Sequence, residues 1–250
     1  KDRSAMLHAK DDDAFGFACQ NGHQKIAKWL LGLCKTAEEK KAMLHANDDS
    51  AFRLACGYGH LETANWLWSI CPELEQLTML NAKDNHVFRL ACQKGHLKIA
   101  KWLWGLCKTA EEKTAMLHAK DNWAFRLACQ NGHIKIAKWL WAICSEQEQS
   151  EMLHSEADYA FCWACGRGHQ EIAQWLWAIC PDDQKSEMLH ENDDDAFGSA
   201  CVEGHLEIAK WLWNICPDDQ KSEMLHENDD DAFGLACQNG YLELAKWLWA

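Results

Sequence analysis

The sequence predicts an all-α fold, built as a solenoid of about seven helical repeats. One observation is a recurring segment, typified by AFRLACQNGHIKIAKWLW, whose copies start at Ala14, Ala51, Val87, Ala124, Ala160, Ala196 and Ala232. Another is the spacing of these copies, which is always 36 or 37 residues. A fixed period in this range is typical of stacked supersecondary units, each of which contacts only its neighbours. We therefore expect one array over residues 1–250, with incomplete repeats at both ends.

Each repeat is expected to begin with a short helix. Acidic or polar residues, such as those at 11–13, precede the Ala-Phe pair, and residues of this kind are favourable N-caps. Phe125, Ala128 and Cys129 then share one apolar face, because they are spaced i, i+3 and i+4. Gly132 ends the helix, since glycine adopts the left-handed conformation that lets the chain reverse. The following segment, HIKIAKWLWAIC, has the same periodicity and predicts an antiparallel second helix.

A third segment, for example KTAEEKTAML, connects each second helix to the next repeat. In three copies a hydroxyl residue is followed three positions later by Glu, which matches the capping box. These pairs are Thr36 with Glu39, Thr109 with Glu112, and Ser145 with Glu148. Other copies begin with Pro72, Pro181 or Pro217, and proline suits the first helical position. We predict a short third helix that ends near the Met-Leu-His triplet and packs Met and Leu inward.

The fourteen cysteines follow the repeat pattern. Seven come after an Ala in the first helix, six close the Trp-rich helix, and Cys162 alone is off the pattern. We interpret them as reduced, buried thiols, because free Cys is among the most buried residue types. Disulfides within repeats and metal ligation are the alternatives, although CxxxH is not a zinc spacing and no CxxC occurs. Reduced thiols imply a cytoplasmic, reducing compartment.

Charge is unevenly distributed along the chain. Residues 1–125 contain 17 Lys and Arg against 15 Asp and Glu, a net charge of +2. Residues 126–250 contain 8 against 23, a net charge of −15. This balance disfavours nucleic acid as a partner and favours a basic protein at the C-terminal repeats. No apolar run approaches the roughly 20 residues that a membrane span needs, so we expect no membrane insertion.

The segment ACQNGHIKIAKWLW resembles the ankyrin repeat, whose usual form is TPLHLAAxxGHxEIVxxLL. The match covers the helix pair of all seven units, with Gly132 and His133 at the turn. The GADxN hairpin finger of the family is absent, and the capped third segment takes its place. The variant is similar to the divergent arrays of large DNA viruses and intracellular bacteria. The resemblance implies a protein-binding scaffold, in the cytoplasm or, for a viral or bacterial effector, in the host-cell cytoplasm.

The recurring polar and aromatic residues are expected to be structural. Histidine follows the turn glycine in six units and follows Met-Leu in six. A histidine that hydrogen-bonds neighbouring backbone explains this recurrence better than catalysis, which needs a single constellation. The paired tryptophans are read first as core between repeats, with an aromatic-ligand site as the alternative. Acidic runs lack the spacing of a calcium loop, so we predict neither a metal nor a cofactor.

Specificity is expected at the positions that differ among repeats. Three such columns surround the first helix: the residue before Ala-Phe, the residue after Phe, and the two residues before the turn glycine. In an ankyrin-like stack these columns line the concave face. Aromatic residues and Arg at the centre of a surface are common interface anchors. The predicted partner-binding residues are Arg53, Tyr58, His86, Arg89, Lys94, Trp123, Arg126, Asn131, Tyr159 and Arg167. The alternative is that Trp123 and Tyr159 fold onto the neighbouring helix.

The leading functional prediction is a non-enzymatic scaffold that binds a protein or peptide on its concave face. No phosphate loop, HExxH or GxSxG motif supports an enzyme. The alternative is a structural protein that stacks end to end into filaments, because solenoids need polar terminal repeats and this chain finishes on AKWLWA. A plainer explanation for the bare end is an array cut from a longer one.

Overall fold

The computed structural model describes residues 7, 12–156, 158–226 and 231–250, and these ranges contain seventeen helices and no strand. The predicted all-α class is confirmed. Contacts divide the chain into two compact units, residues 1–120 and residues 121–250. No helix among the described residues is both long and apolar enough to span a bilayer.

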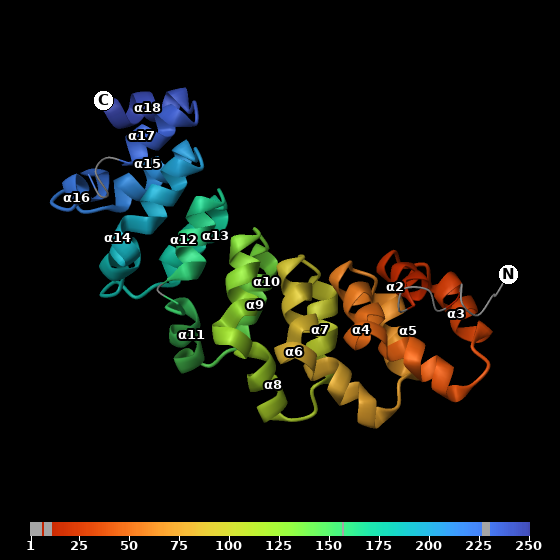
Figure 1. Cartoon of the computed structure of the whole chain (residues 1–250). Coiled ribbons are helices and arrows are strands. Elements are labelled where there is room, and N and C mark those ends of the chain that lie inside the picture. Colours follow the sequence, from red (N-terminus) through yellow and green to blue (C-terminus); the bar gives the residue numbers. More distant parts are fainter. Residues whose placement is uncertain (1–6, 8–11, 157, 227–230) are drawn as a thin grey trace. The chain divides into compact units, whose positions relative to one another are not determined.

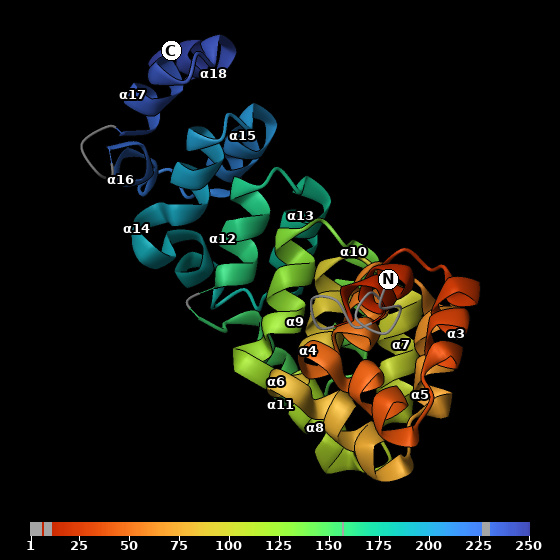
Figure 2. The ribbon, with the colours of Figure 1, turned by 45° about the vertical axis from the view of Figure 1, so that its right-hand side comes forward.

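Both units are built from consecutive helix pairs (Figure 1). The first unit contains α2 (Asp13–Gln20), α3 (Gln24–Leu33), α4 (Ala37–Gly57), α5 (Leu61–Ile70), α6 (Glu73–Gln93), α7 (Leu97–Leu106) and α8 (Ala110–Leu117). The second contains most of α9 (Ala119–Gln130), then α10 (Ile134–Ala142), α11 (Glu146–Leu153), α12 (Tyr159–Gly166), α13 (Gln170–Ile179), α14 (Lys185–Val202), α15 (Leu206–Ile215), α16 (Lys221–His226), α17 (Asp231–Gln238) and α18 (Leu242–Trp249). First helices pack on first helices, α2 on α4 and α4 on α6 in one unit, α12 on α14 and α14 on α17 in the other. Figure 2 shows the same helix pairs from a second direction.

The predicted glycine turn joins the two helices of each pair. Gly132 has φ +79°, and all seven turn glycines have positive φ. The Gly132 amide donates to the Cys129 carbonyl at 3.2 Å, and the His133 amide donates to the Ala128 carbonyl at 2.8 Å. These bonds satisfy carbonyls that the end of a helix would otherwise leave unpaired.

The predicted third helix is present. It forms α8, α11 and α16, and it forms the first part of α4, α6 and α14. Thr109 and Ser145 each make the complete capping box, while the Thr36 hydroxyl accepts from the Glu39 amide at 3.1 Å. Proline is placed differently from the prediction: Pro72 is the N-cap of α6 rather than its first residue. After Pro181 and Pro217 a turn precedes the helix.

The acidic segment before the first helix has a different role from the predicted one. Residues 47–49, 83–85 and 120–122 all have positive φ, so each forms a left-handed turn between the third helix and the next first helix. Asn and Asp tolerate this conformation better than other non-glycine residues, which explains the composition. Asp12 and Asp158 occupy N-cap positions, but neither side chain makes a capping hydrogen bond. The prediction of side-chain N-caps is therefore wrong for these two residues. The equivalent acidic residues at 191–195 do not test it, because the structure does not describe their side chains.

Aromatic triads hold successive repeats together within each unit. The Phe of one repeat contacts the second Trp of its own repeat and the first Trp of the next. In the first unit Phe52, Trp68 and Trp102 form a triad, with ring centroids 6.0 to 6.2 Å apart. In the second unit the triads are Phe125, Trp141 and Trp175; Phe161, Trp177 and Trp211; and Phe197, Trp213 and Trp247. Edge-to-face contacts of this kind add to the burial free energy of the rings.

Cysteine and methionine contribute to the core, and Cys34 lies 3.9 Å from Met43 and Cys107 3.9 Å from Met116, measured between sulfur atoms. Twelve of the fourteen cysteines are buried, and none of the fourteen, all of which lie in the described part of the chain, is joined in a disulfide. Burial raises the pKa of the Cys129 thiol far above its ordinary value and that of Cys71 to about 11. Such thiols stay protonated and chemically inert near neutral pH. The expectation that cysteine is a packing residue is confirmed.

Both predicted histidine series connect neighbouring repeats. The His96 ring nitrogen Nε2 is 3.1 Å from the Gly57 carbonyl oxygen, and that of His169 is 3.0 Å from the Gln130 carbonyl oxygen. In the Met-Leu-His series, His154 contacts Asp158 through Nδ1 and Gln184 through Nε2, both at 2.8 Å. These histidines thus link their own repeat to the repeat beside it, which supports their structural interpretation; His8 and the side chain of His226 lie outside the described part of the chain.

Candidate interaction surface

The predicted site residues lie around the first helices, in two groups that we describe unit by unit. In the first unit, Arg53 and Arg89 come one residue after the buried Phe of α4 and α6. The Arg53 atom Nη2 donates to the Asn47 carbonyl at 2.8 Å. Arg89 donates from Nε and Nη2 to the carbonyls of Asp84 and Lys83 at 3.0 and 2.9 Å. Both guanidinium groups therefore hold the left-handed turn that precedes their own helix.

These hydrogen bonds limit what the two arginines can offer to a partner. Arg89 is only 8% exposed, and Arg53 is half-buried. His86 is also half-buried, and its pKa is lowered by burial and then by the positive charges of Arg89 and Arg53. Tyr58 and Lys94 stand in the turns after α4 and α6 and are exposed, Tyr58 by 53%.

In the second unit the variable residues form a continuous stack of aromatic rings and guanidinium groups. The Cζ atom of Arg126 lies 5.2 Å from the ring centroid of Trp123 and 5.1 Å from that of Tyr159. The Tyr159 ring is 5.2 Å from the Trp163 ring, and the Cζ atom of Arg167 is 4.9 Å from Trp163. We call these five residues the Arg-aromatic ladder. Cation–π contacts of this length are attractive, more so where water is excluded.

The ladder has a buried middle and exposed ends. Arg126 is 5% exposed and Tyr159 half-buried, whereas Trp123 is 38% exposed and Arg167 is exposed. Asn131 is exposed too, but its side-chain amide donates to the Leu127 carbonyl at 2.8 Å and so turns back on its own helix. The structure thus brings Trp123, Arg126, Tyr159 and Arg167 together, and leaves Asn131 outside the stack.

Trp163 is the ladder residue that the sequence analysis missed. It occupies the position that is Leu in four of the other repeats, including Leu54 and Leu127. An aromatic residue in a leucine column was the available signal. This position lies outside the three variable columns from which the binding residues were predicted.

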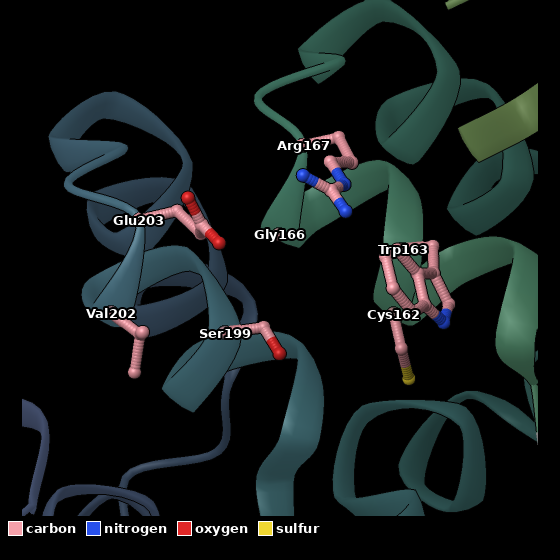
Figure 3. Close-up of a pocket in the computed structure, with 7 residues that line it drawn as sticks. All are labelled: Cys162, Trp163, Gly166, Arg167, Ser199, Val202 and Glu203. Carbon is pink, nitrogen blue, oxygen red and sulfur yellow. The ribbon is translucent and has the colours of Figure 1, made fainter. Parts of the chain in front are cut away.

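A cavity of about 240 Å³ opens beside the ladder, between the end of α12 and the end of α14 (Figure 3). Its walls are Cys162, Trp163, Gly166, Arg167, Ser199, Val202 and Glu203. Figure 3 shows the Arg167 guanidinium and the Glu203 carboxylate bordering the cavity from opposite helices. Gly166 permits the close approach, because a Cβ atom there would lie 2.9 Å from Cβ of Ser199. The cavity is therefore lined by one positive and one negative side chain, Arg167 and Glu203, next to the indole ring of Trp163.

Among the described residues, His45, Cys71 and Glu75 are grouped as metal ligands can be, with their ligand atoms within 4.8 Å of one another. His45 already contacts Glu75 at 2.8 Å, and Lys41 binds the same carboxylate and lowers its pKa. The residue equivalent to Glu75 is Gln184 in a later repeat, where it makes the same contact with histidine. The recurring feature is thus a hydrogen bond between repeats.

Comparison with known proteins places the fold in a family. The sequence profile of three consecutive ankyrin repeats matches residues 15–115 and 125–221, so the chain belongs to the ankyrin-repeat family. Among solved structures it is similar to an ankyrin repeat family protein from Legionella pneumophila, with 19% sequence identity, a TM-score of 0.48, and coverage of 88% of this chain and 84% of that one. Comparison with curated protein sequences finds no match. Ankyrin repeats are generally protein–protein interaction modules, and the family is typically non-enzymatic.

Proposed function

We propose that this chain is a binding scaffold whose partner, a protein or peptide, contacts the Arg-aromatic ladder of the second unit. The observation that supports the proposal is the stack itself, which holds two exposed anchors, Trp123 and Arg167, in fixed positions. Rigid aromatic and Arg anchors beside a cavity are the residues that dominate binding free energy at protein interfaces. Of the other predicted residues, Tyr58 and Lys94 are exposed in the first unit and available to a partner, whereas Arg53, His86 and Arg89 are half-buried or buried.

The charge of the second half of the chain supports a basic partner. With a net charge of −15 over residues 126–250, the surface around the ladder attracts cationic segments and speeds their association. Salt therefore weakens this binding mainly by slowing association. No catalytic group, metal or cofactor is part of the proposal.

A displayed peptide library selected on the intact chain would provide a ligand for the test. The exposed anchors are changed together as Trp123→Ala and Arg167→Ala, because buried Arg126 is needed for the fold. We expect affinity to fall at least tenfold, about 1.4 kcal/mol, as measured by calorimetric titration. The control is Lys135→Ala, which removes one positive charge, as the ladder variant does, from an exposed position of α10 and should leave affinity within twofold. Equal affinity of the ladder variant, with an unchanged melting curve, would contradict the proposal.

A second candidate, end-to-end association of copies, is favoured by incomplete aromatic triads. Trp29 of α3 is the first Trp of its repeat, and it is 62% exposed. Phe233 and Trp249 pair at 5.7 Å as the first two members of a triad, and Trp249 is 81% exposed. Trp29 of one copy is thus the residue that would complete the triad of another.

A further inference from the structure

The first complete repeat departs from the aromatic triad at one position. Its second-helix segment reads AKWLLGLC over residues 27–34, whereas the third repeat reads AKWLWGLC over residues 100–107. Leu31 therefore stands where Trp104 and the second Trp of every later repeat stand. Over the twenty residues from 27 to 46, the only other difference from residues 100–119 is Lys41, which replaces Thr114. These two segments form a natural matched pair for the effect of one missing indole.

The surroundings of two neighbours, Lys40 and Leu44, differ from those in later repeats. In later repeats a lysine of the third helix lies over the second Trp: Lys113 Nζ is 5.8 Å from the Trp104 ring, and Lys185 Nζ is 5.5 Å from the Trp177 ring. The equivalent lysine in the first repeat is Lys40, and it faces Leu31 instead of an aromatic ring. Leu44, which is equivalent to the buried Leu117, is only half-buried.

A cavity of about 420 Å³ lies at this place, entirely within the first unit. Its apolar wall includes Leu31, Leu44, Trp66 and Ile70, and Lys40 borders it. The remaining lining includes the hydrogen-bonded group of Lys41, His45 and Glu75, which forms a polar rim. Trp66 is the first Trp of the second repeat, and its ring is 6.4 Å from Phe15 at an interplanar angle of 66°. Two members of the triad are therefore in place around the space that the third would fill.

We propose that this cavity, the Leu31 pocket, binds the tryptophan side chain of a peptide partner in which acidic residues flank the tryptophan. The indole would occupy the position of the absent second Trp, with an edge contact to Trp66 and the Lys40 ammonium over its face. The cavity is open to solvent, so an indole seated in it would remove the apolar surface of Leu31, Trp66 and Ile70 from water, which is favourable. The Glu75 carboxylate at the rim is an acceptor for the indole N–H, which distinguishes tryptophan from phenylalanine. Lys40 provides the positive charge that selects acidic neighbours, because Lys41 is already paired with Glu75.

The proposal is tested with the peptide Ac-Asp-Trp-Asp-NH₂ and the intact 250-residue chain, by calorimetry and by two-dimensional NMR. We expect saturable binding of one peptide per chain. The variant Leu31→Trp fills the pocket with the residue of the later repeats, so it should raise the melting temperature and reduce affinity at least tenfold. The variant Lys40→Gln keeps the cavity but loses the ammonium, and it should weaken binding several-fold. Replacing the peptide tryptophan by alanine should abolish binding.

A gain-of-function control uses the second unit. The variant Trp177→Leu recreates the apolar vacancy beneath Lys185 and beside Trp211, but there Ser186 and Gln220 replace Lys41 and Glu75. It should therefore bind a second peptide of the neutral sequence Ac-Gly-Trp-Gly-NH₂ more tightly than it binds Ac-Asp-Trp-Asp-NH₂. The ladder variant with Trp123→Ala and Arg167→Ala should bind the tryptophan peptide as the wild type does, which separates this proposal from the ladder. Undetectable binding by the wild type, or equal affinity of wild type and a folded Leu31→Trp variant, would overturn the proposal. It would also be overturned if the wild-type chain self-associates and Leu31→Trp alone makes it monomeric, since a second copy would then be the occupant.

Discussion

At the scale of single residues, the stack depends on contacts between the turn glycine of one repeat and the turn histidine of the next. A Cβ atom on Gly132 would lie 2.7 Å from Cε1 of His169, and on Gly168 it would lie 2.6 Å from Cε1 of His205. The glycine is therefore required twice, for its positive φ and for the space that the imidazole ring occupies. Burial of the ring also lowers the pKa of His169.

Gly132→Ala is predicted to destabilise the chain by roughly 1 to 3 kcal/mol, because the new methyl group meets His169 and alanine is strained at φ +79°. The measurement is the free energy of unfolding from urea denaturation. Gly198→Ala, in the interior of α14, is the matched control, since nothing lies within 4 Å of a Cβ atom there. It should stabilise by roughly 0.5 to 1 kcal/mol through helix propensity. If both substitutions changed the free energy of unfolding in the same direction, this account of the turn would be contradicted.

Apolar residues that recur at the same position of each repeat were sufficient to predict most of this core. Phe125, Cys129 and Ile136, for example, are all buried, as the helical periodicity predicts. The ladder was only partly predictable. Trp123, Arg126, Tyr159 and Arg167 were recognised as exceptions, but their stacking depends on side-chain directions that spacing does not specify. Arg89 was assigned to the surface by its variable column, yet its guanidinium is held inward by two backbone carbonyls. The left-handed turn at 83–85 determines its place, and the Asp and Asn of that turn are equally compatible with an N-cap.

At the scale of secondary-structure elements, the third helix and the left-handed turn replace the hairpin finger of ordinary ankyrin repeats. The helix was predictable because the capping box is a local signal with a fixed spacing. The turn was not, because an acidic run before an apolar helix is equally typical of N-caps. Two side-chain contacts stabilise the three consecutive left-handed residues at 47–49. Arg53 donates a hydrogen bond to the Asn47 carbonyl, and the Asp49 carboxylate contacts the His45 ring.

Thr109→Ala is predicted to destabilise α8 by about 1 kcal/mol, because the Glu112 amide loses its acceptor and the capping box is broken. Amide hydrogen exchange in α8 should speed up accordingly, and the free energy of unfolding should fall. The control is Thr114→Ala, the same substitution at an exposed position inside α8, where alanine favours the helix. If both variants exchanged at the wild-type rate, the cap would contribute nothing to this element.

At the scale of the whole molecule, repetition explains why the fold was predictable while the partner was not. Seven copies of one pattern average out local ambiguity, so helices, turns and core columns could each be identified several times over. A binding surface arises from differences between copies, and these differences are supported by few examples or by one. Leu31 illustrates this, since a single Leu in a column of six tryptophans is inconspicuous in the sequence but opens a cavity in the structure.

End-to-end association is a property of the whole molecule, because Trp29 belongs to the first unit and Trp249 to the second. If a second copy completes the triad, the 250-residue chain should form species whose mass grows with concentration, as head-to-tail contacts do not close. Multi-angle light scattering and sedimentation velocity over a concentration series measure this mass. Trp29→Ser should make the chain monomeric at every concentration, since it removes the docking ring from an exposed position. Tyr58→Ser, which removes another exposed aromatic residue away from both ends, should associate as the wild type does. A wild-type chain that stays monomeric at millimolar concentration would exclude filament formation by these faces and leave the scaffold function as the sole candidate.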